Sequence, residues 1–207
     1  MLDDDDDAHL FRPPEPTPAG TRRFAHYAFA VAAALFVALT WMGLPLHTEV
    51  APAGIVSFEL ARTPGQAIAI VQSWDEAARA RAAIHLSVDY AFLLAYAAWL
   101  WAALRGLALR FEARGEAGAR GARWSRRLAA SMWLAAGLDA VENAALGIIL
   151  AGGFDPEDPE GLLSIDASWP ALAFTCAVFK FALVALALGV LIWGAVKVPV
   201  PPDDERA

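Results

Sequence analysis

The sequence carries polar and ionisable side chains inside stretches that are otherwise apolar and long enough to cross a membrane. They are His85, Asp89 and Tyr96 in one stretch, Asp139, Glu142 and Asn143 in the next, and Cys176 and Lys180 in the last. At the helical period, each set falls on one face of its helix. Ionisable residues within membrane-spanning segments mark ion or substrate pathways, proton relays or interhelical pairs. These side chains therefore define the chemistry to be explained.

The charges in these stretches do not balance. Three carboxylates meet one lysine and one histidine. We expect Lys180 to pair with Asp139, because a rise of about 1.5 Å per residue puts the two at the same depth. Asp89 and Glu142 then remain, and each must be protonated, hydrated or matched by a bound cation.

The primary ligand- or ion-binding candidates are Asp89, Asp139, Glu142, Asn143, Tyr96 and Lys180. The secondary candidates are Glu59, His85 and Cys176, and neither a catalytic residue nor a metal can be named.

A membrane also dictates where these groups point. An ionised Asp or Lys at the centre of a span costs about 2.5–3.5 kcal/mol. Four such groups facing lipid would cost on the order of 10 kcal/mol, which is comparable to the stability of a whole domain. We therefore expect them to face one another inside the bundle or to line a water-filled cavity. A purely structural network of interhelical pairs is the alternative interpretation.

Four apolar blocks must position these residues. Hydrophobic residues make up 58% of the 207-residue chain, charged residues 19%, and the mean hydropathy is +0.44, whereas soluble domains are about 45–50% apolar and about 25% charged. A membrane-spanning helix needs about 20 apolar residues. The blocks of this length are 24–43, 82–104, 128–151 and 170–196. We predict an all-α fold, a polytopic four-helix transmembrane bundle over 24–196, with a disordered acidic, proline-rich tail at 1–23 and a short tail at 197–207.

Basic residues are sorted to one side of this bundle. Twelve of the sixteen Lys and Arg residues lie in the two tails and the 105–127 loop, and three lie in the first outer loop, 44–81. Because cytoplasmic loops carry such an excess, we expect a multi-pass protein of the cytoplasmic (inner) membrane with both termini in the cytoplasm. The chain starts with no short basic leader of the kind that is cleaved. The Arg-rich 105–127 loop either only enforces this topology or also binds anionic lipid headgroups or a cytoplasmic partner.

The first outer loop is too long for a plain connection and carries helix signals. Thr63-Pro64 is typical of an N-cap followed by proline at the first helical position, and apolar residues then recur at helical spacing. We predict a short interfacial helix at 64–74. Ser73 and Glu76 form an S-x-x-E capping-box pattern, which predicts a helix that begins near Trp74 and leads into the second span.

Composition and motifs exclude several functional classes. The single cysteine, Cys176, rules out a disulfide framework and thiolate-cluster metal sites, and we interpret it as a small packing residue. A net charge of −7 gives no support for nucleic-acid binding. The sequence contains no C-x-x-C, G-x-S-x-G or H-E-x-x-H motif and no internal repeat. No cofactor is predicted, and the expected partners are the lipid bilayer, anionic headgroups at 105–127, and a homo- or hetero-oligomeric assembly.

Three functions are compatible with these features. We favour an intramembrane acidic site in the outer half of the bilayer that binds a cation, a proton or a small cationic solute. Translocation of the bound species across the membrane is an extension of this hypothesis. The alternatives are a membrane-embedded enzyme acting on a lipid or isoprenoid, in which paired carboxylates divide acid and base roles, and a structural or accessory subunit of a membrane complex. Glu59 is interpreted either as a solvated or helix-capping carboxylate or as a lid residue that reaches the bundle. The sequence leaves open whether the protein is an enzyme.

Overall fold

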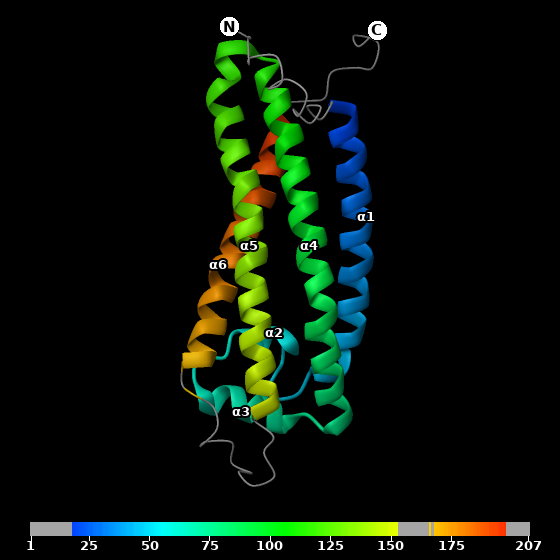
Figure 1. The fold of residues 1–207 in the computed structure, drawn as a ribbon, viewed down its shortest axis with the longest axis vertical. Helices are drawn as coiled ribbons and strands as arrows, with labels where there is room; N and C mark the ends of the chain where they lie inside the picture. Colours follow the sequence, from blue (N-terminus) through cyan, green and yellow to red (C-terminus); the bar gives the residue numbers. More distant parts are fainter. Residues whose placement is uncertain (1–17, 153–165, 167, 198–207) are drawn as a thin grey trace, which may run out of the picture.

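The fold is a bundle of four long helices with a small helical cap at one end. The computed structural model describes residues 18–152, 166 and 168–197. The long helices are α1 (Pro18–Gly43), α4 (Glu76–Glu112), α5 (Ala119–Gly152) and α6 (Ser168–Lys197), and they run along the long axis of the molecule (Figure 1). Each is long and apolar enough to cross a membrane, and the described residues contain no strand. The predicted all-helical architecture with four helices of spanning length is confirmed.

The helices contain the four predicted spans and extend past them. α4 and α5 have 37 and 34 residues, so each is about 50–55 Å long against a hydrocarbon thickness of about 30 Å. α1 begins at Pro18, so residues 18–23, which we assigned to the tail, are helical, and so is Lys197 at the other end. Hydropathy misses these ends because helical turns in water need not be apolar. The remaining tail residues, 1–17 and 198–207, lie outside the described residues.

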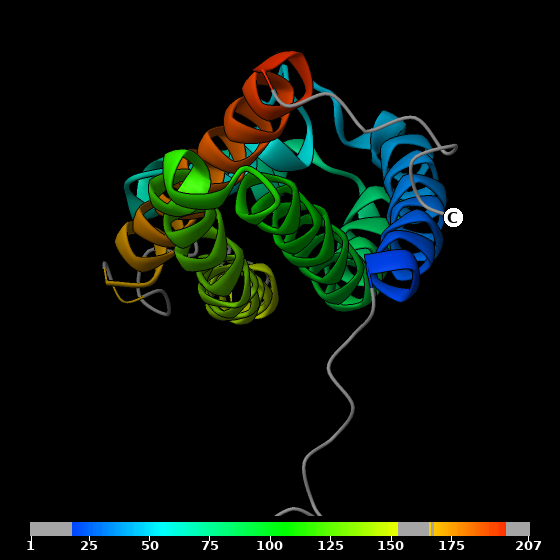
Figure 2. The same ribbon diagram turned by 90° about the horizontal axis from the view of Figure 1, so that it is seen from above.

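α4 is the central helix of the bundle. It packs extensively against α1 on one side and α5 on the other, and α5 packs against α6. α1 makes no comparable contact with α6, and the two stand apart when the bundle is viewed from its end (Figure 2). The long helices thus form a curved row in the order α1, α4, α5, α6.

Three short helices close the end of the bundle that we expect to face outward. They are η2 (Leu44–Leu46), α2 (Ile55–Glu59) and α3 (Pro64–Ser73). Trp74 anchors this cap, since its indole Nε1 donates to the Leu46 carbonyl at 2.9 Å and its buried ring meets Phe58 edge-on. α3 occupies the predicted 64–74 segment and has the predicted cap, because Thr63 Oγ1 accepts a hydrogen bond from the Gln66 amide.

The start of α4 differs from the predicted capping box. Ser73 is the last residue of α3, and its hydroxyl donates to the Ile70 carbonyl. Asp75 is the N-cap of α4 instead, and its carboxylate accepts from the Ala78 amide at 2.7 Å. The predicted capping box is therefore wrong by two residues. Aspartate is as good an N-cap as serine, and Trp74 is extended where it is buried in the cap.

Two apolar clusters stabilise the bundle at different levels. One joins the cap to the nearby parts of α4, α5 and α6, and includes Leu86 and Leu146. The other lies further along the bundle and includes Leu93 and Met132. Between these two levels lie Asp89 in the sequence of α4 and Asp139, Glu142 and Asn143 in the sequence of α5. They therefore occupy a polar layer with apolar packing on either side.

At the other end of the bundle, η3 (Gly115–Gly118) joins α4 to α5. Gly118 is required because a side chain there would lie 1.7 Å from the Phe111 carbonyl oxygen. Arg126 of α5 pairs with Glu112 of α4, and Arg114 ties this hairpin to the carbonyl at the end of α6 at 2.8 Å. The arginine-rich 105–127 segment thus lies at the end of the bundle where α1 begins and α6 ends (Figure 1).

Replacing Trp74 by Phe should destabilise the cap. The variant keeps most of the apolar contact with Phe58 but leaves the buried Leu46 carbonyl without its donor, a loss of about 1–3 kcal/mol. We expect a lower melting temperature for the detergent-solubilised protein. Trp41→Phe is the matched control, because Trp41 is 69% exposed. Equal melting temperatures for the two variants would contradict the anchoring role of Trp74.

Candidate functional site

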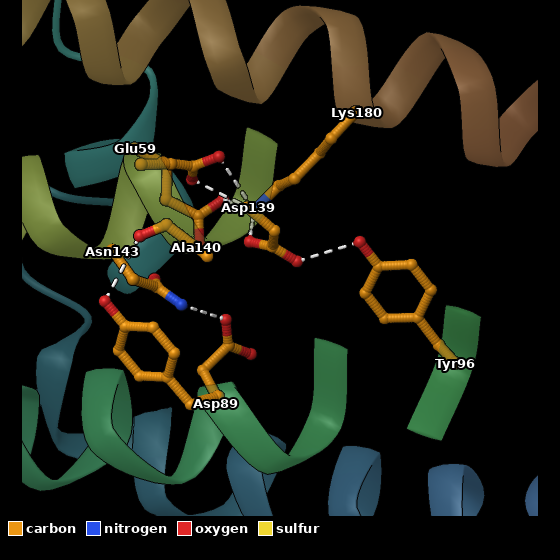
Figure 3. A network of polar contacts seen from close by, with 9 residues as sticks. Glu59, Asp89, Tyr96, Asp139, Ala140, Asn143 and Lys180 are labelled. Carbon is orange, nitrogen blue, oxygen red and sulfur yellow. Dashed lines mark hydrogen bonds and ion pairs between the residues drawn. The ribbon is translucent and has the colours of Figure 1, made fainter. Parts of the chain in front are cut away.

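Lys180 is the centre of the polar layer. Its Nζ lies 2.6 Å from Asp139 Oδ1 (Figure 3). The same atom lies 2.9 Å from Glu142 Oε2 and donates a hydrogen bond to Glu142 Oε1 at 3.0 Å. All three side chains are buried, and the structure contains the Lys180–Asp139 pair that depth along the spans predicts. Because these groups come from α5 and α6, their attraction also holds the two helices at one register.

A third carboxylate reaches Lys180 from the cap. Glu59 is the last residue of α2, is 9% exposed, and has its Oε2 3.7 Å from Lys180 Nζ (Figure 3). Of the two interpretations of Glu59, the geometry fits the lid residue that reaches the bundle. The sequence could not decide between them, because this contact depends on how the cap folds back over helices that follow it in the chain.

Tyr96 and Asn143 orient two of the carboxylates. The Tyr96 hydroxyl donates to Asp139 Oδ2 at 3.0 Å, and Asn143 Nδ2 donates to Asp89 Oδ2 at 2.7 Å (Figure 3). Both hydrogen bonds join α4 to α5. Asp89 is therefore held by an amide, and no basic side chain in the described residues lies within ion-pair distance of it.

The polar layer carries more acid than base. Glu59, Asp89, Asp139 and Glu142 gather around one lysine, so the structure increases the imbalance that the sequence predicts. Burial raises the pKa of Glu59 to about 7, although the nearby Lys180 lowers it, and the charges of Asp139 and Asp89 raise it further. Buried carboxylates without a partner are costly, so protons, water or a bound cation must compensate the excess.

A cavity of about 760 Å³ lies beside the polar layer. Its walls come from α1, α4 and α6, and residues of α2 cover one end. Most of the wall is apolar and includes Phe29 and Phe36 of α1 and Val184 and Leu188 of α6. The sequence candidates that line it are Glu59, His85, Asp89, Tyr96, Asp139 and Lys180. The volume falls in the range of about 300–1,000 Å³ that small-molecule sites occupy.

The other three candidates lie behind the cavity wall. Glu142 acts on Lys180, and Asn143 acts on Asp89, without lining the cavity themselves. Cys176 is a buried free thiol on α6 and also does not line the cavity, which fits a packing role.

Tyr90 makes an interhelical hydrogen bond that the sequence did not predict. Its hydroxyl donates to the Ala140 carbonyl at 3.1 Å and adds another link between α4 and α5. The residue does not share the helix face of His85, Asp89 and Tyr96, so periodicity gave no reason to select it. Its proximity to Asp89 in the sequence was the only signal.

A search for metal-binding groups and comparisons with known proteins give no match for this site. In the described part of the chain, no group of three or more His, Cys, Asp or Glu side chains is arranged to hold a metal ion. Comparisons of the chain with protein-family models, curated proteins and solved structures found no match. The geometry and charge of the site are therefore the basis for its function.

Lys180→Met should destabilise the protein strongly. Methionine keeps an unbranched apolar stem but removes the cation between Asp139 and Glu142, and breaking a buried ion pair in this way costs about 3–5 kcal/mol. The melting temperature should fall well below that of Lys197→Met, which alters the exposed lysine at the end of the same helix. Adding Glu142→Gln to Lys180→Met should restore part of the loss. Lys180→Met and Lys197→Met variants of equal stability would rule out a central role for Lys180.

Proposed function

We propose that this chain is a multi-pass membrane protein that binds an amphipathic cation in the cavity between α1, α4 and α6. The charged group of the ligand would lie against Asp89 and Asp139, and its apolar part along the cavity walls. The observation that carries the proposal is an apolar cavity whose polar wall has more carboxyl groups than cations. Among the solutes considered from the sequence, this favours a small cationic solute and adds the requirement for an apolar body.

The arrangement around Lys180 supports a cation rather than an anion. Lys180 already faces the carboxyl groups of Asp139, Glu142 and Glu59, so it offers little net attraction to an anionic ligand. Asp89 is half buried and lines the cavity, and within the described residues its one hydrogen-bond partner is the amide of Asn143. A cation that reaches Asp89 gains a charge-assisted contact where attraction is weakly screened. An anion in the same place meets repulsion.

The walls and the packing of the bundle support a ligand that comes from the bilayer. Aromatic and branched side chains of α1 and α6 provide most of the cavity surface. These two helices make no extensive contact with each other, so α1 and α6 can be separated by a hydrocarbon chain without losing a packed interface. A hydrated metal ion would gain nothing from such walls.

A membrane-embedded enzyme acting on a lipid or isoprenoid is the second candidate. The same apolar cavity suits such a substrate, and two carboxyl groups can act as acid and base. It ranks second because Asp139 is already bound by Lys180 and Tyr96, and the third carboxyl group that lines the cavity, Glu59, lies beside Lys180. Formation of a new product from membrane lipids by the purified protein, lost in Asp89→Asn, would reverse this ranking.

The binding proposal is tested with three ligands that share a decyl chain. At pH 8 we expect decyltrimethylammonium to bind the detergent-solubilised protein at least tenfold more tightly than decanol, and decanoate to bind least. Asp89→Asn should lower the affinity for decyltrimethylammonium by about tenfold or more, because hydrogen bonds to charged groups contribute about 1.5–3 kcal/mol. The affinity for decanol should not change.

Asp75→Asn is the control, since Asp75 caps α4 away from the cavity and asparagine also caps helices. Isothermal titration calorimetry gives the affinities. Equal affinities for decyltrimethylammonium and decanol, or no difference between the two aspartate variants, would refute the proposal.

We further propose that the protein lies in the cytoplasmic membrane with both termini and the 105–127 segment in the cytoplasm. The excess of arginine at that end of the bundle supports this orientation, and anionic headgroups of the cytoplasmic leaflet would meet the same arginines. The cap of α2 and α3 would then face outward.

Cysteine labelling tests the orientation. In a Cys176→Ala background, Ala69→Cys on α3 and Ala117→Cys in η3 are matched exposed sites at opposite ends of the bundle. A membrane-impermeant maleimide should label Ala69→Cys in intact cells and Ala117→Cys only after lysis. The reverse pattern would show that the bundle has the opposite orientation.

A further inference from the structure

We infer that binding of the cation is coupled to the release of a proton from Glu59 to the outer side. The inference rests on the proposed function and adds how the site is regulated. Protons and amphipathic cations would compete for the cavity, so the ligand would leave as the outer medium becomes acidic.

The other three carboxyl groups of the polar layer all accept hydrogen bonds from neighbouring side chains. Asp139 accepts from Lys180 and Tyr96, and Glu142 accepts from Lys180. Asp89 accepts from Asn143. Such hydrogen bonds favour the charged form of a carboxyl group.

Glu59 differs from these three groups in its partners. In the described residues, no N–H group and no tyrosine hydroxyl donates to it, and its nearest cation is Lys180 Nζ at 3.7 Å, beyond hydrogen-bond distance. Its carboxyl group also faces that of Glu142, with which it can share a proton. Of the carboxyl groups that line the cavity, Glu59 is therefore the one that accepts no hydrogen bond from a lysine, an asparagine or a tyrosine in the described residues.

The position of Glu59 makes it the group that responds to a ligand. It lines the cavity from α2, so a bound cation lies on one side of its carboxyl group and Lys180 on the other. The charged groups that face it from the bundle are Lys180 of α6, Asp139 and Glu142 of α5, and Asp89 of α4. His47 of the cap and His85 of α4 also line the cavity. The pKa of Glu59, raised by burial to about 7, puts its titration in the physiological range.

The exchange conserves the charge of the cavity. An empty site holds Glu59 as the neutral acid, with its proton on the carboxyl oxygen. When the cation enters, the O–H bond of Glu59 breaks, the electron pair stays on the carboxylate and the proton leaves to water at the cap. One positive charge enters and one leaves, so the net charge of the polar layer is the same in both states.

The coupling is tested with decyltrimethylammonium, whose charge does not change with pH. At pH 6, calorimetric titrations in buffers of different ionisation enthalpy should show the release of close to one proton per bound cation. Affinity should rise by about tenfold per pH unit below pH 7 and level off above pH 8. Glu59→Gln should bind without proton release and with an affinity that does not depend on pH. Glu49→Gln, on an exposed residue of the cap, should behave as the wild type.

The outcomes distinguish a failure of the proton coupling from a failure of the proposed cation site. Binding of decyltrimethylammonium without proton release, or proton release that persists in Glu59→Gln, would overturn the coupling and leave the cation site intact. A cation that binds no better than decanol at any pH would overturn both. If Glu59→Gln does not fold, the proton count and pH slope of the wild type still decide, because a count near zero refutes the exchange.

Discussion

The structure depends on the attraction between one buried lysine and the carboxyl groups gathered around it. Lys180 on α6 contacts Asp139 and Glu142 on α5 directly and faces Glu59 of the cap. In an apolar medium these charges cannot be left unpartnered, so the helices that carry them can meet at only one relative depth. Tyr96 extends the constraint to α4 through its hydrogen bond to Asp139. One cluster thus sets the relative depth of three long helices and the position of the cap.

The cavity follows from the same constraint. α4, α5 and α6 are drawn together by the polar layer, whereas α1 packs extensively only on α4. α1 therefore stands away from α6, and apolar side chains line the space between them. The acidic groups that Lys180 does not neutralise face this space, with Asp89 on one wall and Glu59 at the covered end. A structural ion-pair network would need no such surplus and no such cavity.

The sequence predicted those features that depend on regular helices or on neighbouring residues. Depth along a helix increases uniformly, so the pairing of Lys180 with Asp139 could be predicted across two separate spans, and the Thr63 cap is a local pattern. The position of Glu59 over Lys180 and the apolar α1 wall could not be predicted, because both depend on how non-neighbouring elements pack. The capping box failed for a local reason, since Asp75 competes with Ser73 for the start of α4.

The central claim is that the carboxyl groups of the polar layer exceed its cations and that one of them, Glu59, is protonated until a bound cation replaces its proton. Infrared difference spectroscopy tests this claim directly, because the C=O stretch of a protonated carboxyl group is separate from the bands of carboxylates. At pH 6, the empty protein should show a protonated-carboxyl band that decreases when decyltrimethylammonium saturates the site. A spectrum without that band in the empty protein, or a band that the ligand leaves unchanged, would contradict the account.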